Sequence, residues 1–412
     1  MSEETLDVLL ARAESDPPFS TQEYASRLAK VREAMEHAGI DLLYLSAPES
    51  ICYLSGHERQ WYQGQAPMDW HPGSGIAVSV SSDTYMHFED EDEAVLARLT
   101  SATTDLRIRR HGASVRPWID FVVAELSSSG WLKGTVGLEM WSSRPNRGYG
   151  ESFQSAIEAM GCRVVDATKL TRGVRRLKSD AELAAIRAAE HVAELGMQAA
   201  REHITTGATE LDVYAEVVAA MAHGGGETPG VPVLVGSGPR SACVHALPSR
   251  RVIERGDIVN VDICGVWHRY HASLARCFSI GEPLPEVGAA IGKMSGVLDI
   301  LAERLRPGLP IAEFSQTAEE YYREAGIWNE RWWVGGYELG IAFPPDTVGE
   351  FYYEVGGDPG TETFDPGLVC NFEGNFYLPK ASGVAVQTST MIFESREAQF
   401  DFDTSPGLIV VE

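Results

Sequence analysis

The chain has 412 residues, of which 44% are hydrophobic, 9% aromatic and 23% charged. This length and composition suit two globular domains of ordinary size and exclude wholesale disorder. The formal net charge of −25, with histidine taken as neutral, argues against nucleic acid or an anionic membrane as a partner and is compatible with a small cationic substrate.

Two features indicate a cytoplasmic protein. The first twenty residues carry several acids and no basic stretch, unlike a secretory signal, and no apolar run is long enough to span a membrane. The six cysteines lie far apart without a C-x-x-C pair, so we expect them to be buried thiols.

The first half of the chain alternates helices and strands. The capping box Ser20-Thr-Gln-Glu23 predicts the start of a helix, which Gly39 ends. The remaining expected elements are strands at 41–45, 75–82, 106–110, 135–140 and 162–167, and helices near 91–99, from 117 and near 152–160. This alternation favours a small α/β domain, which we place at residues 1–170.

The second half predicts a repeated order of two helices followed by strands. Capping boxes at Ser179–Glu182 and Thr209–Asp212 open the first two helices. The other expected elements are strands at 231–237, 257–267 and 270–280, helices at 287–305 and 311–325, and strands at 368–378, 383–393 and 407–412. We therefore predict an α+β domain over residues 171–412.

The stretch from His245 to Gly281 resembles the creatinase/aminopeptidase, or pita-bread, family. His245, the Gly256-Asp257 turn and Asp262 follow the family order. Further matching motifs lie at 19–27, 177–182, 335–340 and 371–374, so the resemblance covers about residues 18 to 408. It implies a creatinase-like α/β N-terminal domain and an α+β pita-bread C-terminal catalytic domain.

The resemblance also locates the metal ligands that the family's peptidases use. The five positions fall on Asp262, Ser273, Tyr337, Glu373 and Gln387. Only two of them are carboxylates, whereas a pair of divalent ions needs several anionic oxygens. We therefore predict that the metal centre is lost and that no cofactor is used.

What remains is similar to creatinase and to the ectoine hydrolases, which share the run seen here at 340–350. This implies His245 as general acid and base, Glu373 as the group that orients water or substrate, and Asp262 as a supporting carboxylate. We therefore expect a metal-independent hydrolase that cleaves a C–N bond of a small cationic amidine or guanidine. Attack by water and attack by a carboxylate through a covalent adduct both fit these residues.

A further set of residues is expected to contact the substrate. Aromatic side chains in the stretch 57–72 would form a wall for a planar cation, and in creatinase-like dimers this loop reaches over the partner's active site, so the resemblance implies a homodimer. The expected contacts are Tyr337, Glu338, Asp346, Glu350, His271, Trp61, Tyr62 and Trp70.

Three alternatives stay open. The first is a metal-dependent Xaa-Pro peptidase or lyase of the same fold, against which the neutral residues at 273, 337 and 387 argue. The second is a non-catalytic relative that binds a ligand, and the third is a biosynthetic enzyme acting on a C–N bond. His245 beside a strand is also compatible with a structural histidine, and Asp262 with a carboxylate that only bonds to the backbone.

Overall fold

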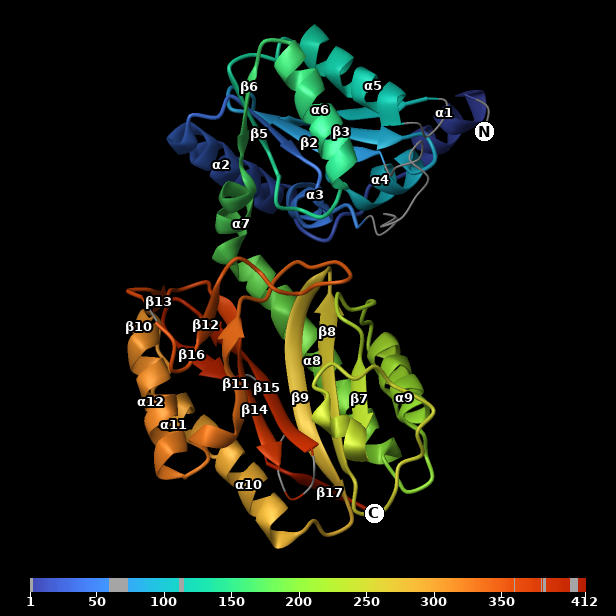
Figure 1. Cartoon of the computed structure of the whole chain (residues 1–412). Helices are drawn as coiled ribbons and strands as arrows, with labels where there is room; N and C mark the ends of the chain where they lie inside the picture. The colour runs from blue at the N-terminus through green and yellow to red at the C-terminus, as the bar shows by residue number, and fades with distance from the viewer. Residues whose placement is uncertain are drawn as a thin grey trace. The chain divides into compact units, whose positions relative to one another are not determined.

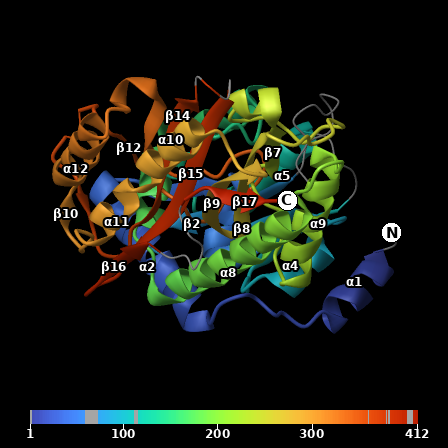
Figure 2. The same ribbon diagram turned by 90° about the horizontal axis from the view of Figure 1, so that it is seen from below.

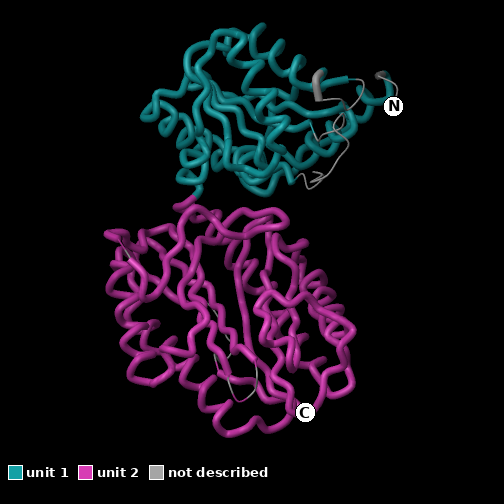
Figure 3. The backbone as a smooth tube through the Cα atoms, viewed as in Figure 1, with its two compact units in different colours: residues 1–175 teal, residues 176–412 magenta. Residues whose placement is uncertain are grey.

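The computed structural model describes residues 3–58, 73–110, 115–358, 360–378, 380, 383–400 and 407–412. It divides into two compact units, Met1–Arg175 and Arg176–Glu412 (Figure 3). The expected boundary at residue 170 lies inside a helix, α7 (Thr168–Arg176), and the units separate at the end of that helix.

The first unit is built on a six-stranded mixed sheet in the order β4-β3-β2-β1-β5-β6. The pairs β1–β2 and β2–β3 are antiparallel, whereas β3–β4, β1–β5 and β5–β6 are parallel. Helical crossovers of the kind that the alternating sequence predicts connect parallel strands. The strands are β1 (Leu42–Leu45), β2 (Ser74–Ser79), β3 (Tyr85–Asp90), β4 (Leu106–Arg109), β5 (Thr135–Leu138) and β6 (Arg163–Asp166).

The best-defined helix of this unit is α2 (Thr21–Ala38). The Ser20 side chain accepts a hydrogen bond from the Glu23 amide, and Gly39 ends the helix with a left-handed φ of 64°, as predicted. Its buried side chains include Leu28, Val31 and Met35, and the helix contacts α3. The core over the sheet contains Trp118, Phe153 and Ile157. The other helices are α1 (Glu3–Arg12), α3 (Pro48–Ser55), α4 (Ala94–Thr100), α5 (Val115–Ser128) and α6 (Arg147–Ala159).

The second unit contains a nine-stranded sheet whose main path is β12-β11-β14-β15-β9-β8-β7, with β16 beside β15 and β17 beside β9. At its centre β8 and β9 form a hairpin with a two-residue turn, His268 and Arg269, both at positive φ. This turn sets the register of the two strands. The strands are β7 (Leu234–Ser237), β8 (Ile258–Trp267), β9 (Tyr270–Ile280), β11 (Arg331–Tyr337), β12 (Tyr352–Glu354), β14 (Val369–Leu378), β15 (Gly383–Phe393), β16 (Ala398–Phe400) and β17 (Ile409–Val411).

Two groups of helices cover this sheet, each over its own apolar cluster (Figure 1). Helices α8 (Asp180–His203) and α9 (Glu210–His223) lie side by side (Figure 2) and pack on β7, β8 and β9. Helices α10 (Pro285–Ser295), α11 (Val297–Ala302) and α12 (Ile311–Glu324) pack on β11, β14 and β15. Both predicted capping boxes are present, at Ser179–Glu182 and Thr209–Asp212. Short elements complete the unit: η1 (Gly238–Ala242), β10 (Leu309–Pro310), η2 (Trp328–Glu330) and β13 (Thr363–Phe364).

The structure corrects two sequence expectations. The single helix expected at 287–305 is broken at Gly296, where a Cβ would lie 2.3 Å from the Tyr321 hydroxyl oxygen. Five cysteines are buried as expected, but Cys243, which follows η1 directly, is exposed. Within the described ranges, none of the helices has the length and apolar character that crossing a membrane requires.

Candidate functional site

The helices cover one face of the large sheet, and two carboxylates lie on the other. A Cβ on Gly265 of β8 would meet the Ala189 carbonyl oxygen of α8 at 1.8 Å, so Gly265 faces the helices. Because side chains alternate along a strand, Asp262 and Cys264 face away from them. Gly374 of β14 lies against Tyr322 of α12, and its neighbour Glu373 therefore also faces away.

Register brings the two carboxylates into one row across four strands. Asp262 pairs with Ala275, Ala275 with Thr388, and Thr388 with Glu373. Burial raises the pKa of Asp262 to about 8, and the negative charge of Glu373 adds to the shift. Burial likewise raises the pKa of Glu373. Asn375 Nδ2 donates a 2.9 Å hydrogen bond to Glu373 Oε1, which lowers this pKa but does not cancel the effect of burial. The pair therefore retains a proton on Asp262 near neutral pH.

Tyr337, the last residue of β11, lies beside this pair. Its backbone amide donates to Asn371 Oδ1 at 2.8 Å, which ties the end of β11 to β14. Burial raises the pKa of the Tyr337 phenol well above its ordinary value, and the negative charge of Glu373 raises it further. Tyr337 is therefore a neutral hydroxyl, able to donate a hydrogen bond to a substrate oxygen.

A thiol and a hydroxyl complete the row next to Asp262. Cys264 Sγ lies 3.2 Å from Ser273 Oγ. Burial raises the pKa of the Cys264 thiol to about 12. Cys264 thus stays protonated and does not supply a thiolate nucleophile.

The residues at the five family positions do not fit a pair of metal ions. Ser273, Tyr337 and Gln387 are neutral, and the two carboxyls have raised pKa values. Gln387 is 1% exposed, pairs with Gly374, and finds no hydrogen-bond partner for either amide atom among the described residues. Within that part of the chain, no group of three closely spaced His, Cys, Asp or Glu ligand atoms includes Asp262 or Glu373. Two dications would lack the anionic oxygens that their binding requires.

The predicted acid and base, His245, lies in an exposed turn after η1. Its ring meets the ring of Trp332 on β11 edge to face, with centroids 6.3 Å apart. Trp332 is itself 44% exposed. Across the described residues, no hydrogen bond or ion pair joins His245 to Asp262 or Glu373. The structure therefore brings His245 to the strand that ends at Tyr337, without contact to the carboxyl pair.

Glu338, expected to contact substrate, is 4% exposed and ion-paired. Lys178 Nζ lies 2.7 Å from its Oε1, and the backbone amides of Glu350 and Phe351 donate to its Oε2 at 3.2 and 3.3 Å. The carboxylate thus joins the start of α8 to the segment before β12. This arrangement is typical of a structural carboxylate.

His271 also has both ring nitrogens engaged. Its Nε2 accepts from the Gly230 amide at 2.8 Å, so Nδ1–H donates to the Arg269 carbonyl at 2.8 Å. Burial lowers the pKa of His271 to about 3, and the charge of Arg269 lowers it further. The ring is therefore a neutral support for the 226–233 segment.

Five expected substrate contacts remain, of which two are in the described part of the chain and three are not. Asp346 is exposed, and its Oδ1 caps the following turn by accepting from the amides of Thr347 and Val348. Glu350 is partly buried. Trp61, Tyr62 and Trp70 lie outside the described residues.

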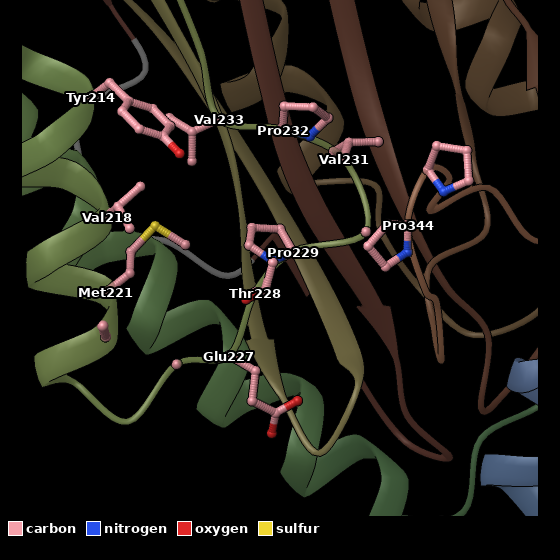
Figure 4. A pocket seen from close by; sticks show the side chains of 14 residues that line it. Tyr214, Val218, Met221, Glu227, Thr228, Pro229, Val231, Pro232, Val233 and Pro344 are labelled. Carbon is pink, nitrogen blue, oxygen red and sulfur yellow. The ribbon is translucent and has the colours of Figure 1, made fainter. Parts of the chain in front are cut away.

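A cavity of about 470 Å³ lies between α9 and the segment that His271 supports (Figure 4). Tyr214, Val218 and Met221 of α9 line one side of it, as Figure 4 shows, and Pro344 lies across from them. Prolines and aliphatic side chains dominate the lining, so the cavity suits an apolar group. Pro344 and Pro345, which precede Asp346, belong to its lining.

One polar pattern was missed by the sequence reasoning. In β14, Asn371, Glu373 and Asn375 alternate with Phe372, Gly374 and Phe376. A period of two places the three polar side chains on the same face, so the alternation itself could have identified them.

Comparison with known proteins identifies two family models along the chain. The model described as Creatinase/Prolidase N-terminal domain matches residues 27–177, and the model described as Metallopeptidase family M24 matches residues 184–393. Together they account for both units and confirm the expected fold class and the resemblance to the pita-bread family.

Curated relatives align along most of both chains. An Xaa-Pro dipeptidase of Pyrococcus furiosus is 23% identical over 374 residues, 90% of this chain and 95% of that protein. A Mycobacterium tuberculosis protein named "Probable dipeptidase PepE" is 27% identical over 379 residues, 91% and 94% of the two chains. An ectoine hydrolase of Halomonas elongata is 25% identical over 401 residues, 92% and 95% of the two chains.

Solved structures agree on the fold. Dipeptidase PepE from Mycobacterium ulcerans superposes with a TM-score of 0.76 at 24% identity, covering 95% of this chain and 99% of that one. The prolidase from Pyrococcus horikoshii gives a TM-score of 0.73 at 22% identity, covering 91% and 97%.

These matches overturn the expected reaction. The prediction of a metal-independent hydrolase of amidines or guanidines is wrong, because the matching family model is that of metallopeptidases and two of the three relatives above are named as dipeptidases. The three relatives are hydrolases by name, which agrees with the expectation of a hydrolytic enzyme.

Proposed function

The chain belongs to metallopeptidase family M24, and we propose on this premise that it hydrolyses the amide C–N bond of a small dipeptide-like substrate at the open face of its large sheet. The observation that carries the proposal is the pair Asp262 and Glu373, which occupies two of the family's ligand positions and shares a face with Tyr337. The names of both dipeptidase relatives support a dipeptide as the substrate class, and the name of the Pyrococcus furiosus relative supports an Xaa-Pro dipeptide.

The residues present do not supply the ligands of a two-ion centre, and the roles assigned here are those of this chain's own side chains, with or without a bound metal ion. Two neighbouring carboxyls with different proton affinities can divide the tasks of acid and base. Glu373, in its ionised form, takes a proton from water as the water oxygen attacks the amide carbon. The protonated Asp262 then transfers its proton to the leaving nitrogen, so that two products with free ends are released.

Tyr337 supplies the third function, stabilisation of the oxygen that becomes negative. Its hydroxyl stays protonated, since burial and the negative charge of Glu373 raise its pKa. A hydrogen bond from a neutral donor to the carbonyl oxygen becomes stronger as negative charge develops on that oxygen, and this lowers the barrier to the reaction. His245 and Trp332 meet at the opposite end of the same strand, and we assign them to contacts with the outer part of the substrate.

The test is a panel of dipeptides followed by proton NMR, with Ala-Pro, Leu-Pro and Gly-Pro against Ala-Ala. The full chain is assayed after chelation and again with added Mn²⁺ or Zn²⁺. We expect release of proline, and a fall of about 10²-fold or more in Glu373→Gln and Asp262→Asn. Glu324→Gln, which changes an exposed carboxylate on α12, is the matched control. Absence of proline release under all conditions, or full activity in Glu373→Gln, would overturn the proposal.

A second function, binding the same ligands without cleaving them, is favoured by the neutral Ser273, Tyr337 and Gln387. Calorimetric titration of the wild-type chain with Ala-Pro separates the two. Heat of binding that Glu373→Gln weakens, with intact dipeptide recovered afterwards, would establish a binding protein. Recovery of free proline would establish the enzyme.

The family resemblance also supports a homodimer, and the cysteine pattern and N-terminal composition support a cytoplasmic location. Light scattering after size exclusion should then give twice the mass of one chain. A single-chain mass at micromolar concentration would contradict this part of the proposal.

A further inference from the structure

The N-terminal unit contains a second cluster of ligand-type side chains, remote in sequence from Asp262 and Glu373. His57, His87 and Glu89 are each 0% exposed. One ligand atom from each lies within 4.8 Å of the others. Both histidine Nε2 atoms are 3.6 Å from Glu89 Oε2, and the two ring centroids are 5.4 Å apart.

Two separate segments position these side chains. His57 follows the C-terminal end of α3, where Gly56 takes a φ of 81° and a Cβ would collide with the Tyr24 hydroxyl at 2.4 Å. The His57 amide then donates to Ser55 Oγ at 3.1 Å, which fixes the direction of the chain. His87 and Glu89 lie two residues apart on β3, so they face the same side of the sheet.

Each histidine is oriented through its other ring nitrogen by a threonine. His57 Nδ1 lies 2.9 Å from Thr100 Oγ1, and His87 Nδ1 lies 2.9 Å from Thr103 Oγ1. Ligating histidines in metal sites are held in the same manner, by a hydrogen bond from the nitrogen that does not bind the metal.

The Thr100 hydroxyl decides the tautomer of His57. Thr100 Oγ1 donates its single hydrogen to the Leu96 carbonyl at 2.9 Å, so it can only accept from the ring. The Nδ1 of His57 is therefore the protonated nitrogen, and in the neutral ring Nε2 carries a lone pair. This lone pair faces Glu89 Oε2, and the two atoms can bind one cation between them.

The distances identify the kind of cation. A separation of 3.6 Å is too long for a hydrogen bond between nitrogen and oxygen. It is close to the distance between two ligand atoms of a tetrahedral zinc site. That distance is roughly 3.4 Å when the zinc–ligand bonds are about 2.0–2.1 Å. Imidazole and carboxylate ligands together suit zinc and other divalent transition metals.

We propose that His57, His87 and Glu89 form a binding site for one divalent transition-metal ion of the zinc type. The ion would hold the end of α3 against β3 inside the N-terminal unit, with one coordination position left for a further donor. Because all three ligands are buried, its binding would stabilise the folded unit. This site is independent of the proposed reaction in the C-terminal unit.

The experiment uses the full chain, stripped with a chelator and titrated with Co²⁺, whose visible absorption reports tetrahedral nitrogen and oxygen ligands. Metal content is measured after dialysis against Zn²⁺. We expect one equivalent in the wild type, and its loss in His57→Gln and Glu89→Gln. The variant Thr100→Val keeps all three ligands and should bind about 10–100-fold more weakly, because only the orienting bond is removed.

Two controls locate the ion. His191→Gln changes an exposed histidine of α8 and should leave binding unchanged. The double variant Asp262→Asn/Glu373→Gln removes both carboxyls of the C-terminal site and should also retain one equivalent.

X-ray absorption at the zinc edge gives a readout that needs no variant. Two imidazoles and one carboxylate oxygen in the first shell would support the site. Absence of bound metal would overturn the proposal. Loss of the ion only in the Asp262→Asn/Glu373→Gln variant would also overturn it, by assigning the metal to the C-terminal site.

Discussion

Replacing Asp262 by asparagine should change how the stability of the protein depends on pH. In the folded chain, burial and Glu373 raise the pKa of Asp262 from 3.8 to about 8. Between these two values the folded state holds a proton that the unfolded state has released. Stability that depends on this proton is therefore fully present below pH 4 and is lost as the pH rises towards 8.

The magnitude follows from the size of the shift. One unit of pKa difference corresponds to about 1.4 kcal/mol, so the free energy of unfolding should fall by up to that amount per pH unit within the window. The full shift would correspond to roughly 6 kcal/mol for a completely shielded carboxyl. Asp262 is partly reached by solvent, and we expect about half of that.

The assay is urea unfolding of the wild type and of Asp262→Asn at pH 5, 6, 7 and 8. The contribution of the N-terminal unit is common to both proteins and cancels in the difference. The difference in unfolding free energy should move in favour of the variant as the pH rises, while Glu324→Gln follows the wild type. Parallel pH profiles for the wild type and Asp262→Asn would refute the reasoning, because Asp262 would then titrate alike in both states.

Three further substitutions test the supports of the site. Lys178→Met leaves the Glu338 carboxyl buried without its cation and should cost about 3–5 kcal/mol of unfolding free energy in urea. His271→Phe removes two buried hydrogen bonds and should cost about 1–3 kcal/mol; in the wild type, the low pKa predicts that its ring nitrogens do not titrate by NMR between pH 8 and 4. Gly265→Ala places a methyl group 1.8 Å from a backbone carbonyl of α8 and should lower the melting temperature sharply, whereas Gly292→Ala, with open space around it, should not.

For each of these three substitutions, one result would contradict the reasoning. Adding Glu338→Gln to Lys178→Met should restore part of the lost stability, and no recovery would mean that the lysine acts through packing alone. A His271 ring that gains a proton above pH 5 would contradict its place as a neutral support. Equal melting temperatures for the two glycine variants would show that β8 and α8 are not in close contact.

Local sequence patterns determined the elements themselves. Capping boxes such as Ser179–Glu182 and a left-handed stop such as Gly39 act over a few residues, so their physics is contained in the sequence. The break at Gly296 was missed because it depends on the approach of Tyr321, which belongs to another helix. The order of the family motifs located Asp262 and Glu373, since insertions between motifs leave that order unchanged.

Only the tertiary structure decided which side chains meet. Asp262 and Glu373 lie more than a hundred residues apart, and four strands in register place them on one face. The sequence could not distinguish Glu338 from a substrate-binding carboxylate, because its buried partner Lys178 is 160 residues away along the chain. Side-chain contacts of this kind depend on long-range strand pairing and burial, which local sequence propensity does not encode. The contact among His57, His87 and Glu89 has the same origin.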